Sequence, residues 1–154
     1  MPDADTVELT FTSVYRHKVD EKRRVPIPYR WRPKTSVEYT LMLFLEQDIG
    51  NYLRVLPPAQ WLKLLEEIKG MPSDHEQKPI LQRIVGRDST EVKLDSAGRL
   101  MIPDIMAEAA DIKGEAVLAG NLGHFELWSP TRHALLEEKD KAERLNVLKR
   151  VRAL

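Results

Sequence analysis

The sequence predicts a β-rich α+β fold made of two copies of one β-rich half. Three observations support this prediction. A block of residues occurs twice, short runs of alternating apolar and polar residues accompany each copy, and amphipathic helical patterns separate the copies. The chain has 154 residues, of which 42% are hydrophobic, so it is long and apolar enough to bury a core.

The repeated block spans residues 18–28 and recurs at residues 93–103, with a constant offset of 75. A second similarity, at offset 72, relates residues 53–56 to residues 125–128. Because two ordered blocks at nearly equal spacing are far rarer by chance than one short match, we interpret the chain as an internal duplication. The residues that recur unchanged in the longer block are Lys18, Asp20, Arg24, Ile27 and Pro28, which return as Lys93, Asp95, Arg99, Ile102 and Pro103.

Each copy of the block predicts a strand, a turn and a second extended segment. Asp20 and Asp95 follow the first strand, where an Asp side chain can accept hydrogen bonds from nearby backbone N–H groups. Gly98 supplies a position in the second turn that tolerates positive φ. We therefore expect Asp20, Asp95 and Gly98 to be structural turn residues.

The order of these patterns divides the chain into five expected segments. An acidic N-terminal tail covers residues 1–10, and the first half covers residues 11–57. Residues 58–86 are expected to form connecting helices, because apolar residues recur at helical spacing. The second half covers residues 87–130, and a charged C-terminal helix is expected over residues 131–154.

Prolines set the expected limits of the short helices in the two halves. Pro103 suits the first turn of a helix over residues 104–110. Pro28 takes the same place in the first half, but Pro33 should end that helix early.

Several functional classes are disfavoured by the residues present. The chain has no cysteine, which excludes a disulfide framework, a thiolate metal site and a Cys nucleophile. Its four histidines lack metal-ligand spacing, and we find no Gly-rich phosphate loop or nucleophile elbow. No stretch approaches the ~18 apolar residues that cross a bilayer. We expect a cytoplasmic protein with no enzymatic activity, metal, cofactor, small-molecule substrate or membrane partner.

Basic residues are concentrated near the first turn, although the net charge of the chain is zero. Residues 14–34 contain eight basic and two acidic side chains. Guanidinium groups match phosphate oxygens and guanine edges, whereas lysines add affinity without reading sequence. A solvated loop whose charges keep the protein soluble is the alternative, and the charge pattern alone does not decide against it.

The second copy carries a family resemblance. Asp95-Ser-Ala-Gly-Arg99 with Ile102-Pro103, followed by His124-Phe-Glu-Leu-Trp128, resembles the second half of the MraZ family of bacterial transcriptional regulators. The resemblance implies AbrB-like swapped-hairpin halves that form an intramolecular pseudo-dimeric β-barrel with peripheral helices. It also implies ring-shaped homo-oligomers in the nucleoid, which bind repeated boxes of double-stranded DNA upstream of the division and cell-wall gene cluster.

The resemblance further implies that the Arg of the first turn is a main DNA contact. That residue is Arg24, and Arg99 is its second-copy equivalent; both are expected to point outward. Arg23 stands where the family usually has Gly, and a positive φ there would cost ~1 kcal/mol or more. The basic residues expected to add DNA contacts are Arg23, Lys22, Lys18, Arg16 and Lys93.

Two other functions stay open on the sequence. The chain resembles AbrB-like antitoxins, in which the C-terminal segment would cover a toxin, although antitoxins usually carry one copy of the half. It also fits a non-catalytic assembly protein whose basic loop has non-specific DNA affinity.

Overall fold

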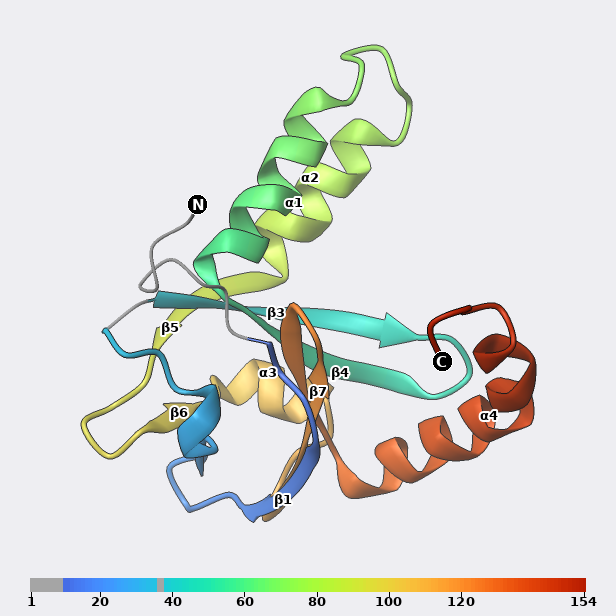
Figure 1. Cartoon of the computed structure of the whole chain (residues 1–154). Coiled ribbons are helices and arrows are strands. Elements are labelled where there is room, and N and C mark those ends of the chain that lie inside the picture. The colour runs from blue at the N-terminus through green and yellow to red at the C-terminus, as the bar shows by residue number, and fades with distance from the viewer. Residues whose placement is uncertain (1–9, 36–37) are drawn as a thin grey trace.

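The computed structural model describes residues 10–35 and 38–154, so the expected acidic tail lies outside the described residues except for Thr10. A six-stranded sheet forms the centre of the fold and helices flank it, which confirms the β-rich α+β prediction (Figure 1). The elements, in chain order, are β1 (Val14–Lys18), β2 (Arg24–Pro26), the 3-10 helix η2 (Tyr29–Trp31), β3 (Glu38–Glu46), β4 (Gly50–Leu56), α1 (Pro58–Gly70), α2 (Lys78–Arg87), β5 (Ser89–Lys93), β6 (Arg99–Met101), α3 (Asp104–Ala109), β7 (Glu115–Asn121), β8 (His124–Trp128) and α4 (Pro130–Leu148).

The main sheet is antiparallel and has the order β1-β7-β8-β4-β3-β5. Each half contributes its first strand to the edge of the other half's hairpin: β1 pairs with β7, and β5 pairs with β3. The two hairpins meet at the centre, where Leu53 lies opposite Leu127 and Val55 opposite Phe125. In the duplication β1, β3 and β4 correspond to β5, β7 and β8. When each strand is replaced by its counterpart, the same strand order results, counted from the opposite edge of the sheet.

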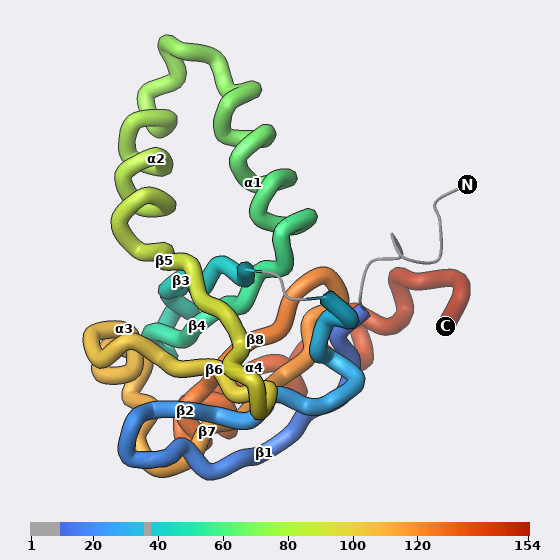
Figure 2. The backbone as a smooth tube through the Cα atoms, turned by 90° about the vertical axis from the view of Figure 1, so that its left-hand side faces the viewer, coloured from blue at the N-terminus to red at the C-terminus, as the bar shows by residue number. Residues whose placement is uncertain are grey.

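A separate two-stranded ribbon joins the repeated blocks. In this ribbon, β2 pairs with β6, and Val25 lies opposite Leu100 (Figure 2). The Ile27 N–H donates to the Gly98 carbonyl at 3.0 Å, and the Ile102 N–H donates to the Arg23 carbonyl at 2.9 Å. Because the second bond repeats the first at an offset of 75, the ribbon has an approximate two-fold axis near its central pair.

The predicted closed barrel is wrong for the strands that the structure describes. They form an open sheet with β1 and β5 at its edges, together with the separate β2–β6 ribbon. The reason is that the chain leaves the main sheet at each repeated turn. The strands that follow the turns, β2 and β6, pair with each other and do not extend the main sheet.

The hydrophobic core joins residues of the sheet to residues of the ribbon. Val25 and Leu100 are fully buried, and they belong to the same cluster as Trp31 and Phe125. The rings of Trp31 and Phe125 lie 5.0 Å apart, so the short η2 helix is fixed to β8. Burial of each such side chain stabilises the fold by ~1.5–3 kcal/mol. Because both sheets pack on one core, the positions of the two repeated turns relative to the main sheet are fixed.

The helices extend away from this core. In Figure 1, α1 and α2 project from the sheet as a hairpin, and α4 lies at a different side of the molecule, away from that hairpin. The α4 helix starts after Ser129, whose hydroxyl accepts a hydrogen bond from the Arg132 N–H at 3.2 Å. No helix within residues 10–35 and 38–154 has the length and apolar character needed to cross a membrane.

Candidate nucleic-acid interface

The first repeated turn, between β1 and β2, is organised by one carboxylate. Asp20 Oδ1 accepts hydrogen bonds from the Lys22 N–H at 3.0 Å and from the Arg24 N–H at 2.8 Å. The backbone closes the turn, since the Asp20 N–H donates to the Arg24 carbonyl at 3.1 Å. The Arg24 N–H bond is the main cause that holds the pKa of Asp20 below its ordinary value of 3.8.

The second repeated turn, between β5 and β6, has the same hydrogen bonds. Asp95 Oδ1 accepts from the Ala97 N–H at 3.0 Å and from the Arg99 N–H at 2.9 Å. Here too the pKa of the Asp95 carboxyl lies below its ordinary value, chiefly because of the Arg99 N–H bond. Two segments separated by 75 residues therefore fold alike down to single hydrogen bonds.

Each turn arginine is held by the aspartate of its own turn. Arg24 Nε donates to Asp20 Oδ2 at 2.7 Å, and Arg99 Nε donates to Asp95 Oδ2 at 2.9 Å. The arginine side chains keep 31% and 35% of their surface exposed. Both arginines thus lie at the surface, but each is half-exposed and ion-paired with the aspartate of its own turn, which the sequence analysis did not predict. In both arginines the hydrogen bond to the aspartate uses Nε.

Pairing of β2 with β6 brings both turns onto one surface. Val25 and Leu100 face the core, so the residues on either side of them in each strand face outward. Arg99 Nη1 lies 4.0 Å from Asp20 Oδ2, which places the second turn beside the first. We use the name turn face for the outward residues of the ribbon and its two turns; these are Asp20, Lys22, Arg24, Pro26, Asp95, Arg99 and Met101.

Acidic residues from distant segments offset part of the basic run. Arg16 forms an ion pair with Glu115 on β7, and Lys93 Nζ lies 3.8 Å from Glu38 Oε1 on β3. Lys18 and Lys22 are exposed, and neither takes part in an ion pair within the described residues. The surface around the turns is consequently less basic than residues 14–34 suggest by themselves.

Arg23, which lies 75 positions before Gly98, has a positive φ of 59°. Its Nε donates to the Ile102 carbonyl at 3.1 Å, and its Nη1 lies 2.7 Å from Asp104 Oδ1 at the start of α3. These two contacts with the second half offset the backbone strain of ~1 kcal/mol or more. They also direct Arg23 toward α3.

Gly98 occupies the matching position in the second turn, where φ is 75°. A Cβ atom there would lie 2.3 Å from the Cζ of Arg32, whose Nε donates to the Ile27 carbonyl at 2.8 Å. Ile27 and Ile102 are equivalent in the duplication, so Arg32 and Arg23 donate to equivalent carbonyls. Arg32 binds a carbonyl five residues earlier in the chain, whereas Arg23 binds one in the other half. Arg32 was not among the predicted site residues, because no local signal in the sequence indicates that its side chain reaches the other turn.

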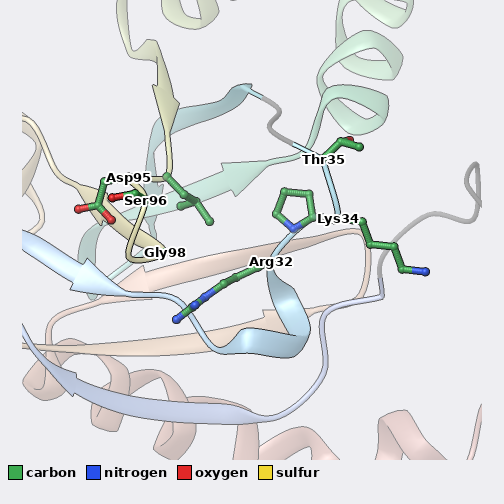
Figure 3. A pocket seen from close by; sticks show the side chains of 8 residues that line it. Arg32, Lys34, Thr35, Asp95, Ser96 and Gly98 are labelled. Atoms are coloured by element: carbon green, nitrogen blue, oxygen red, sulfur yellow. The ribbon is translucent and has the colours of Figure 1, made fainter.

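A pocket of about 420 Å³ separates the second turn from the segment that follows η2 (Figure 3). Figure 3 shows Lys34 pointing away from Asp95, whereas Arg32 extends toward Gly98. Tyr29, on η2, is 85% exposed, and Trp31 is buried. Of Tyr29 and Trp31, only Trp31 therefore belongs to the core. Among residues 10–35 and 38–154, no group of three or more His, Asp or Glu side chains could hold a metal ion.

Comparison with known proteins places these turns in a family. The transcriptional regulator MraZ of Roseiflexus castenholzii is 32% identical over 122 residues, which cover 79% of this chain and 82% of that protein. The chain belongs to the MraZ family. MraZ of Coxiella burnetii is 31% identical over 128 residues, covering 82% of this chain and 84% of the relative. MraZ of Moorella thermoacetica is 29% identical over 122 residues, with 79% and 82% covered.

A family model described as "MraZ protein, putative antitoxin-like" matches residues 87–151. The matched part runs from the end of α2 into the C-terminal segment and includes the second turn with Asp95 and Arg99. The first turn of this MraZ chain lies outside that match, and the hydrogen bonds shared with the second turn relate the two within the structure.

Proposed function

We propose that this MraZ-family chain is a sequence-specific transcriptional regulator whose turn face binds double-stranded DNA. The observation that carries the proposal is the pairing of β2 with β6, which brings Arg24 and Arg99 onto one outward surface. The relatives described above are named transcriptional regulators. The major groove is ~12 Å wide and admits a two-stranded β-ribbon.

The Asp–Arg pairs suit base recognition better than general attraction to phosphate. Because Asp20 binds Nε of Arg24, the plane of the guanidinium group is fixed before DNA arrives. Its terminal nitrogens can then donate together to O6 and N7 of a guanine. The carboxylate also offsets the positive charge, which weakens non-specific binding to phosphates. Arg24 is thus the primary base contact in this proposal, and Arg99 is its counterpart.

The remaining basic residues have graded roles. Lys18 and Lys22 are exposed and supply phosphate contacts. Arg16 and Lys93 already face Glu115 and Glu38, so their contributions are smaller. Arg23 contributes mainly by fixing the first turn against α3.

The exchange of edge strands supports a finer statement about the architecture. We propose that residues 11–57 and 87–130 are AbrB-like halves with swapped hairpins, joined by the α1–α2 hairpin and followed by the C-terminal helix. The support is that β1 pairs with β7 of the other half, and β5 pairs with β3.

A regulator with few phosphate contacts gains affinity when several copies bind tandem boxes together, through effective concentration. We propose that copies of this chain form a ring and bind repeated boxes upstream of the division and cell-wall gene cluster, in the nucleoid of the cytoplasm. Exposed aliphatic side chains on the projecting hairpin support self-association; these are Leu62, Leu65, Ile80 and Ile84. Light scattering of the purified chain tests the ring, and a monomeric mass at all concentrations would contradict it.

The DNA assignment is tested by selecting bound sequences from a random pool and then measuring the affinity of Arg24→Ala for the selected box. Loss of a bidentate guanine contact costs ~1–3 kcal/mol, so we expect affinity to fall about tenfold or more. Arg144→Ala, on the exposed surface of α4, is the matched control and should bind like the unaltered chain. Equal affinity of folded Arg24→Ala, or a pool without an enriched sequence, would refute the proposal. Co-purification of a small unrelated protein would instead favour the antitoxin function.

A further inference from the structure

The turn face contains one well-exposed apolar side chain, that of Met101. The ribbon places Met101 directly opposite Arg24, and Arg99 opposite Pro26. Met101 is 57% exposed, although its neighbour Leu100 is fully buried. Single exposed apolar side chains are common on protein surfaces. This one differs in its position, because it lies on the turn face beside Arg24, where a group bound by Arg24 can also contact it.

The hydrogen-bond pattern shows that Met101 lies close to Arg24. The ribbon bonds of Ile102 with Arg23 and of Ile27 with Gly98 identify the hydrogen-bonded pairs. These alternate along an antiparallel ladder, so Arg24 and Met101 form a pair without backbone hydrogen bonds. Opposite side chains approach each other most closely in such pairs. A group contacted by Arg24 would therefore have Met101 next to it.

The duplication does not repeat this arrangement. The residue equivalent to Met101 in the first half, 75 positions earlier, is Pro26. Arg24 therefore has a flexible thioether as its neighbour, whereas Arg99 has a rigid ring. The two arginines are equivalent in their turns but not in what lies beside them, so the two halves present different surfaces to a DNA site.

The chemistry of the major groove supplies a fitting ligand for Met101. Thymine presents an apolar C5-methyl group there, next to its O4 acceptor, and apolar side chains contact it. Methionine is unbranched and polarizable, so it adapts to such a group without strain. Resting on the proposed DNA-binding function, we propose that Met101 determines specificity by contacting the methyl group of a thymine beside the base bound by Arg24.

Replacement of single thymines by deoxyuridine in the selected box tests this proposal, because it removes only the methyl group. We expect one position at which uracil weakens binding of the unaltered chain about fourfold, the effect of one buried methyl group. Met101→Ala should bind the thymine box about fourfold more weakly and should no longer distinguish uracil at that position. Met101→Leu, which stays apolar, should restore the distinction. Ile105→Ala removes another exposed apolar side chain, on α3, and should leave it unchanged.

The outcomes separate this inference from the proposed function. If Arg24→Ala weakens binding but Met101→Ala still distinguishes thymine from uracil, the inference is overturned and the DNA-binding function stands. A smaller oligomer mass for Met101→Ala, with unchanged preference for thymine, would overturn it in favour of a contact between copies. If no sequence is selected and Arg24→Ala has no effect, both fail.

Discussion

Asp20 and Asp95 are the residues on which each turn depends, since each binds two backbone N–H groups and the Nε of an arginine. Their role as turn residues can be predicted from the sequence, because Asp at the end of a strand has a local partner two residues later. The ion pair of Arg23 with Asp104 has no such local signal, since the two residues are 81 positions apart. The ion pair of each turn arginine was also not predicted, although the aspartate that forms it lies only four residues earlier in the chain.

The lowered pKa values of Asp20 and Asp95 predict a dependence of stability on pH. A carboxyl whose pKa is lower in the folded than in the unfolded chain stabilises the fold fully above its unfolded pKa. That contribution is lost as the pH falls from about 4 through the lower folded value. Replacing both residues by Asn should therefore reduce stability at pH 7 and flatten its decline below pH 4. Urea unfolding from pH 7 to pH 2.5 measures both effects, and superimposable pH profiles would contradict the prediction.

At the scale of elements, the sequence largely predicts where strands and helices occur, but it does not predict which strands pair with each other. The helix expected before Pro33 is the short η2 helix, and Pro103 precedes α3 as expected. No local pattern in residues 14–18 indicates that β1 pairs with β7, about 100 residues away. For the same reason the turn face could not be predicted from the sequence. Met101 lies opposite Arg24 only because β6 pairs with β2.

The second turn gives the sharpest prediction at this scale. Gly98→Ala places a side chain at φ of 75° and a Cβ against Arg32, so it should destabilise the fold by ~1–2 kcal/mol or more. Gly114→Ala is the control, because nothing lies within 4 Å of the added atom. The free energy of unfolding in urea measures both variants. Equal stability of the two would show that the turn tolerates a side chain at residue 98.

For the whole molecule, the duplication predicted from the sequence corresponds to two turns with the same hydrogen bonds and to a sheet that both halves share. The predicted closed barrel does not form among the described strands, because the β2–β6 ribbon is separate from the main sheet. Charge showed the largest gap between sequence and structure. Glu115 and Glu38 lie far from residues 14–34 in the chain, yet the fold places them against Arg16 and Lys93. The basic run of the sequence therefore overstates the positive charge of the surface around the turns.

Cleavage of DNA by a tethered reagent tests most directly whether the turn face contacts DNA. The chain has no cysteine, so Ala97→Cys creates a unique attachment point on the second turn for an iron chelate that cuts DNA nearby. Glu143→Cys, on the exposed surface of α4, provides the matched control. We predict cuts within the selected box from the reagent at residue 97 and none from residue 143. Cuts from residue 143 alone, in a complex of unchanged affinity, would contradict the claim.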